Sequence, residues 1–160
     1  MTETMLTDEF AAYMRMVSKR YLQRVRSTIH TVAMLESELA ELDGMMDGLK
    51  AVDYSRDRVS APATDDGMVN AIARMESLRA EYRDELDGHL QVKAGAHAAL
   101  AHVRQPWRAV LTYRYLQGLA WADVAERAGY SEAYCKGELH DNGLLELYPY
   151  VPHDELPEAM

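Results

Sequence analysis

The chain has 160 residues, of which 48% are hydrophobic and 27% charged, a balance that is ordinary for a folded protein of one domain or two small ones. Its net charge of −9 excludes a generally basic nucleic-acid-binding protein, so any contact with DNA must come from a local patch. A single cysteine, Cys135, excludes an internal disulfide and fits a reducing compartment. The sequence shows no signal-peptide pattern and no apolar run approaching about 20 residues, so we expect a cytoplasmic protein of a bacterial host without a membrane partner.

Two long amphipathic helices are predicted over residues 1–104. Apolar residues recur at spacings of three and four from Val25 to Leu49, stop in the polar segment "DYSRDRVSAPATDDG", and resume from Met68 to Val103. This segment reads as a loop over about 53–66, and one loop between two such helices predicts an antiparallel hairpin. A hairpin covers one seam, so the apolar residues beyond it predict a third helix, a second copy of the chain (a homo-oligomer) or a partner protein.

The first helix carries a basic patch. Five cations and no acid fall between Phe10 and Leu35, which gives a local charge of +5; they are Arg15, Lys19, Arg20, Arg24 and Arg26. One interpretation is a surface for phosphates or for an acidic partner. The alternative is a solvated face, or pairing with acids on the returning helix.

A separate module of three helices is predicted over 105–148, followed by an acidic tail over 149–160. Helices read from "PWRAVLTYRYLQ" to Gly118, from "AWADVAERA" to Gly129, and from an N-cap at Ser131 to about Leu147. Small Ala125, a glycine four residues later for the left-handed turn, and Cys135 as a buried plug follow the spacing of a helix-turn-helix. The predicted fold class is therefore all-α, a long helical hairpin followed by a helix-turn-helix module.

The segment "LTYRYLQGLAWADVAERAGYSEAYCKGELHDNGLLEL" resembles region 4 of bacterial sigma factors and, more closely, the RinA/ArpU-like family of phage and prophage transcription regulators. The residues at matching places are Arg114, Tyr115, Gly118, Trp121, Ala125, Gly129, Tyr130, Ser131, His140 and Leu144. With the upstream loop and helix, the similarity covers most of residues 20–147. It implies a regulator that binds promoter DNA through the C-terminal module. RNA polymerase is a further candidate partner, because recruitment by it could offset weak attraction to DNA.

The module departs from that family in charge. Its third helix has the single cation Lys136, and from Pro106 to Leu147 four cations against six acids give −2. Acids can read cytosine amino groups but weaken attraction to phosphates. The residues that we predict to contact DNA are Glu132, Ala133, Tyr134, Lys136, Gly137 and His140, with Arg114 and Arg127 on flanking phosphates.

Catalytic, metal and cofactor sites are not predicted. Cys135 and His140 are five residues apart, which on a regular α-helix points them in different directions, so Cys135 is expected in the core rather than as a nucleophile. No phosphate-binding glycine loop or metal-ligand spacing stands out, and we do not expect an enzyme. Two other functions remain open: a protein-interaction module whose helix-turn-helix does not bind DNA, for example one that binds RNA polymerase, and a small-terminase-like packaging adaptor.

Overall fold

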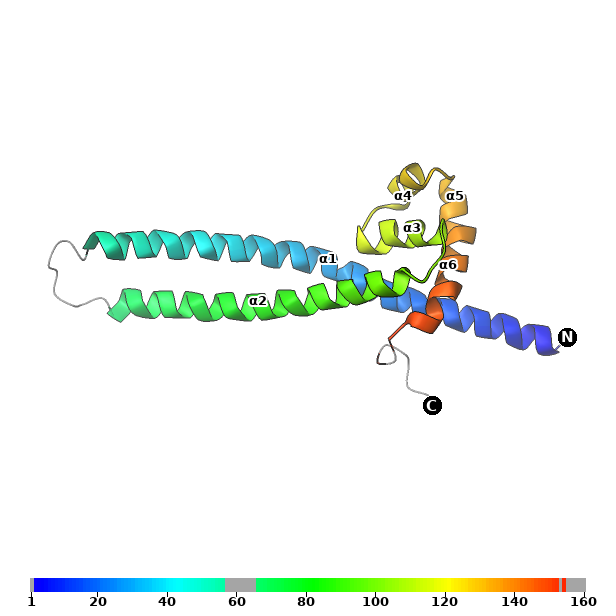
Figure 1. Ribbon diagram of the computed structural model, residues 1–160, viewed down its shortest axis with the longest axis horizontal. Coiled ribbons are helices and arrows are strands. Elements are labelled where there is room, and N and C mark those ends of the chain that lie inside the picture. The colour runs from blue at the N-terminus through cyan, green and yellow to red at the C-terminus, as the bar shows by residue number, and fades with distance from the viewer. Residues whose placement is uncertain (1, 57–65, 153, 155–160) are drawn as a thin grey trace. The chain divides into compact units, whose positions relative to one another are not determined.

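The computed structural model describes residues 2–56, 66–152 and 154, and every regular element among them is a helix (Figure 1). The predicted all-α class is confirmed. Two long helices come first, α1 (Thr2–Arg56) and α2 (Asp66–Leu100). Most of the loop predicted over about 53–66, and most of the predicted tail over 149–160, lies outside the described residues.

Shorter helical segments follow α2. They are α3 (Trp107–Leu111), the π-helical turn η1 (Thr112–Leu116), α4 (Trp121–Ala128), α5 (Glu132–Tyr134), the π-helical turn η2 (Cys135–Leu139), α6 (His140–Leu147) and the 3₁₀ turn η3 (Tyr148–Tyr150). Thus α3 and η1 form one rod, and α5, η2 and α6 form another. No helix in the described part of the chain has the length and apolarity needed to cross a bilayer.

The chain divides into two compact units, and the division differs from the boundary predicted at residue 104. Unit 1 comprises residues 1–29 and 91–160, and unit 2 comprises residues 30–90. Each long helix therefore contributes to both units. The N-terminal half of α1, with its basic patch, belongs with the C-terminal helices.

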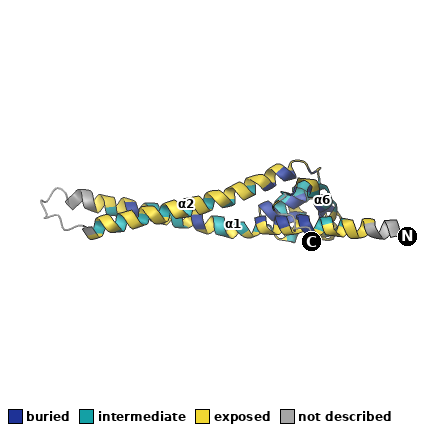
Figure 2. Cartoon of the chain, turned by 90° about the horizontal axis from the view of Figure 1, so that it is seen from below, coloured by how far each residue is buried: buried dark blue, intermediate teal, exposed yellow. Residues whose placement is uncertain are grey.

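Unit 2 consists of two helical segments that run side by side in opposite directions (Figure 1). Among its described residues Leu35, Leu42 and Met46 are buried, at the spacings of seven and four that keep one helix face towards a neighbour. Arg79 of α2 forms an ion pair with Asp43 of α1, with 3.0 Å between Nη1 and Oδ1. Exposed positions dominate the rest of the two segments (Figure 2).

The main core of unit 1 forms because α1 carries Val17, Tyr21 and Val25 on one face, four residues apart. Against them pack Ala96 and Leu100 of α2, together with buried residues of the C-terminal rods, namely Leu111, Tyr115, Leu116, Leu144 and Leu147. This packing holds α1 against the C-terminal rods.

A second, smaller core lies inside the C-terminal module. It joins Val110, Val124, Cys135 and Leu139, all buried, so the prediction that Cys135 is a core residue is confirmed. Gly129 has φ +79° and supplies the left-handed turn predicted there. The Ser131 hydroxyl accepts a hydrogen bond from the Tyr134 N–H at 3.2 Å, which confirms the predicted N-cap.

The two π-helical turns change which residues share a helix face. In η1 the Gln117 N–H bonds to the carbonyl of Thr112 at 3.0 Å, and in η2 the His140 N–H bonds to the carbonyl of Cys135. Bonds of this i→i+5 type bring residues five apart onto one side of the helix. Cys135 and His140 are both buried: Cys135 lies in the smaller core with Val110, Val124 and Leu139, and the His140 ring contacts Tyr115 and Trp121.

Candidate functional site

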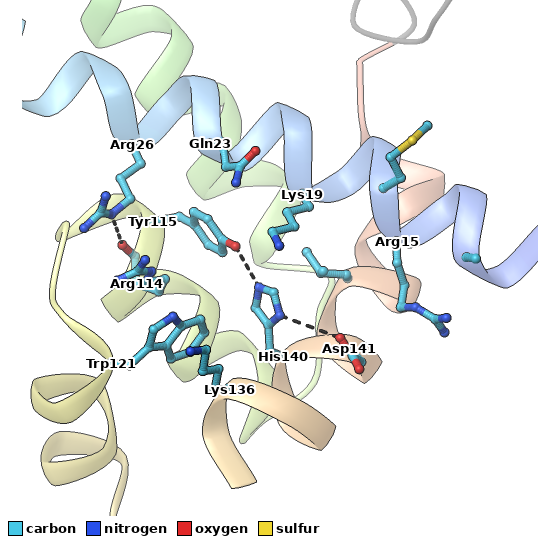
Figure 3. A pocket seen from close by; sticks show the side chains of 13 residues that line it. Arg15, Lys19, Gln23, Arg26, Arg114, Tyr115, Trp121, Lys136, His140 and Asp141 are labelled. Atoms are coloured by element: carbon cyan, nitrogen blue, oxygen red, sulfur yellow. Dashed lines mark hydrogen bonds and ion pairs between the residues drawn. The ribbon is translucent and has the colours of Figure 1, made fainter. Parts of the chain in front are cut away.

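A cleft of about 520 Å³ lies in unit 1, where the first half of α1 passes the C-terminal rods (Figure 3). Five cations line it, from three parts of the chain: Arg15, Lys19 and Arg26 from α1, Arg114 from η1, and Lys136 from η2. Asp141 is the one carboxylate among the lining residues. The fold therefore gathers a strongly positive surface in a chain whose net charge is −9.

The basic patch of α1 is split by the geometry of the helix. Residues 15, 19, 23 and 26 are three or four apart and line the cleft together. At about 100° per residue, Arg20 and Arg24 are rotated by about 140° and 180° from Arg15. Neither lines the cleft, so three of the five predicted patch residues belong to this site and two do not.

Arg26 and Arg114 are held in place by backbone carbonyls. Arg26 donates from Nε to the carbonyl of Arg114 at 3.2 Å and from Nη2 to that of Gly118 at 3.4 Å. Arg114 donates from Nη1 to the carbonyl of Leu119 at 3.1 Å, and its guanidinium carbon lies 4.9 Å from the centroid of the Trp121 ring. Burial and the neighbouring charge of Arg26 lower the pKa of Arg114. Both side chains meet the carbonyl end of the α3–η1 rod, where the helix dipole favours cations.

His140 is buried at the floor of the cleft. Its Nε2 lies 2.7 Å from the Tyr115 hydroxyl, its Nδ1 lies 3.8 Å from Oδ1 of Asp141, and Trp121 meets the imidazole edge-on with 5.1 Å between ring centroids. Burial lowers the pKa of His140 to about 4, and the cations Lys19 and Arg114 act in the same direction, against the opposing effect of Asp141. The imidazole is therefore neutral at pH 7 and adds no charge to the cleft.

The residues predicted to contact DNA fall into three groups. Glu132, Ala133, Tyr134 and Lys136 are exposed along the outer face of α5 and η2, and Gly137 is half-buried. His140 is inside, hydrogen-bonded to Tyr115, which differs from the exposed face predicted for it. The two arginines predicted on flanking phosphates separate: Arg114 lines the cleft, whereas Arg127 is exposed and donates to Gln117 Oε1 at 3.0 Å.

Four polar or aromatic lining residues were not predicted as part of a site: Gln23, Tyr115, Trp121 and Asp141. For Gln23 a signal was present, because it continues the 15, 19, 23 series on one helical face. The other three depend on how the C-terminal rods pack against α1. Burial raises the pKa of the nearby Cys135 thiol, which argues against a nucleophile there.

No known protein family, curated protein or solved structure matches this chain. Within the described ranges, no group of three or more His, Cys, Asp or Glu side chains is arranged to hold a metal ion. The functional argument therefore depends on the residues of the chain itself.

Proposed function

We propose that this protein is a phage- or prophage-type transcription regulator that binds promoter DNA through a helix-turn-helix formed by α4 and the α5–η2–α6 rod. The observation that carries the proposal is a set of four exposed residues, Glu132, Ala133, Tyr134 and Lys136 (the exposed row), of which Lys136 also lines the cleft with four other cations. The C-terminal module alone has a charge of −2, which would weaken its attraction to phosphates, and the cations of the cleft offset that charge. Positive charge comes from α1, next to the face that would meet the bases.

Removal of Lys136 should test base reading. In a binding titration with DNA fragments from around the protein's own gene, Lys136→Ala should weaken specific binding by about 1–3 kcal/mol if the ammonium makes a good base contact. Lys50→Ala removes the same charge from an exposed position in unit 2 and is the matched control. Equal losses for the two variants, or no fragment bound better than random DNA, would reject the assignment of a DNA-reading helix.

The role of the acids has its own test at Glu132, the exposed first residue of α5. If this carboxylate repels phosphates, Glu132→Gln should raise affinity for every sequence alike. If the Glu132 carboxylate instead accepts a hydrogen bond from a cytosine, the Gln variant should lose sequence preference at that one base position. Glu126→Gln on α4, also exposed, makes the same charge change away from the row.

A second function, docking of a protein such as RNA polymerase, is favoured by one observation. Glu132, Glu138 and Asp141 are all exposed on the α5–η2–α6 rod and present a negative surface that a basic protein would fit. Retention of purified RNA polymerase by the wild type, but not by a Glu132→Gln, Glu138→Gln variant, would support docking. Docking would replace DNA binding as the function only if the DNA titration described above also showed no specific binding.

Self-association is proposed for the helical segments of unit 2. Apolar side chains there remain well exposed: Met34 52%, Met45 47%, Val69 61%, Leu78 37% and Leu90 40%. Burial of such surface in a second copy is favourable by about 25 cal/mol per Å². Sedimentation equilibrium should give a mass above the 18.1 kDa of one chain, and a single 18.1 kDa species over a hundredfold range of concentration would contradict self-association.

A further inference from the structure

The cationic cleft has features of a ligand site in its own right. Arg15, Lys19 and Lys136 make no hydrogen bond or ion pair with any described residue, although they line the same cleft. Figure 3 shows Arg15 and Lys19 extending from α1 towards the C-terminal rods. Like charges gathered around one cavity repel each other, and a bound anion relieves that repulsion.

The arrangement suits phosphate more than a single carboxylate. Arg26 and Arg114 use part of their donors on backbone carbonyls, which fixes each planar guanidinium while leaving other N–H groups for a ligand. A volume of about 520 Å³ is in the range of small-molecule sites and exceeds what one phosphate needs. With five cations against one carboxylate, the cleft matches an anion of several charges.

Recognition of a nucleobase ring is not built into the cleft. One face of Trp121 is covered by Arg114, and the Trp121 ring is also nearly perpendicular to the imidazole of His140. Tyr115 is buried, with 3% of its surface exposed. Because Arg114 covers one face of Trp121 and Tyr115 is buried, stacking with a base is disfavoured, and we expect contacts with phosphate oxygens instead.

We infer that this cleft binds two or more neighbouring phosphate groups, through Arg15, Lys19 and Lys136 with Arg26 and Arg114 fixed behind them. Phosphates of this kind are supplied by a DNA strand or by a free polyphosphate compound. The DNA source rests on the proposed function: Lys136 belongs both to the exposed row on η2 and to the cleft, so a strand beside the row would reach the cleft. The contact would be independent of sequence.

The first arm of the test uses inorganic tripolyphosphate and the full chain. We expect saturable binding by calorimetry, with a shift of the Trp121 indole N–H resonance as a local reporter. Arg15→Gln with Lys19→Gln should weaken binding at least tenfold. The matched control, Arg20→Gln with Arg24→Gln, removes the same two charges from the same helix outside the cleft and should change binding less than twofold.

The second arm uses a random-sequence DNA duplex. If the strand occupies the cleft, the Arg15→Gln, Lys19→Gln variant should lose about two phosphate contacts. Each contact contributes about 0.9 to the slope of log affinity against log salt, so the slope should become shallower by about that amount per contact. The control pair should leave the slope unchanged. Tripolyphosphate binding without this change in slope would assign the cleft to a free polyphosphate. Absence of both effects, or equal effects of the two double variants, overturns the inference. That result is distinguishable from failure of the proposed function, which is decided by specific binding of the Lys136→Ala and Glu132→Gln variants.

Discussion

Between pH 6.5 and pH 4, His140 should remove about 3 kcal/mol from the free energy of unfolding of unit 1. Its pKa in the folded protein is about 4, against 6.5 for a free histidine. Each pKa unit corresponds to about 1.4 kcal/mol. In this interval the unfolded chain binds a proton that the folded protein does not, so stability falls as the pH falls through 6.5 and the loss is complete near pH 4.

The cause is the surroundings of the ring. In the tautomer with its proton on Nδ1, towards Asp141, the Nε2 atom accepts from the Tyr115 hydroxyl at 2.7 Å. Protonation would end that acceptor role inside a buried site that also faces the cations Lys19 and Arg114. The negative charge of Asp141 favours the protonated ring but offsets only part of this cost. Its side chain is 57% exposed, so solvent screens its charge.

Urea titrations followed by tryptophan fluorescence measure this effect, because Trp107 and Trp121 both belong to unit 1. His140→Gln should lower stability at pH 7 but flatten its dependence on pH between 6.5 and 4. His97→Gln replaces an exposed histidine of α2 and should keep the wild-type dependence. A wild-type slope in His140→Gln would show that other groups, such as carboxylates, carry the acid sensitivity.

The sequence was sufficient for features set by local chemistry. Helical spacing and the absence of strand patterns predicted the all-α class. Ser131 as an N-cap and Gly129 as a left-handed turn depend on one or two residues each, and both are confirmed. Burial of Cys135 followed from its position between apolar residues at helical spacing.

Features that depend on long-range packing were beyond the sequence. His140 directly follows a π-helical turn at Cys135–Leu139, and its hydrogen-bond partner, Tyr115, is 25 residues away in sequence. The spacing of apolar residues does not predict such a π-helical turn, because the spacing around it is also that of a regular α-helix. The cleft likewise joins Arg15 to Lys136, and net charge along the chain does not reveal which cations converge.

Gly143 provides the second large effect, because α3 and α6 cross at this residue. A Cβ atom added there would lie 2.9 Å from Cδ1 of Leu111 and 3.2 Å from Cβ of Trp107. Leu111 is fully buried, and the Cβ atom of Trp107 is bonded to the backbone and cannot swing away. We therefore expect Gly143→Val to destabilise unit 1 by about 3 kcal/mol, at the upper end of the cost of overpacking.

Gly137 is the matched control on the same rod. A Cβ atom there has nothing within 4 Å, so Gly137→Val should change stability by less than about 1 kcal/mol, since valine is the better helix former. Gly143→Val should also weaken tripolyphosphate binding, because Gly143 lies three residues after His140 and a displaced α6 would shift the floor of the cleft. Equal stabilities of the two variants would mean that α3 and α6 can separate without cost, and the close crossing at Gly143 would then not be what positions the cleft.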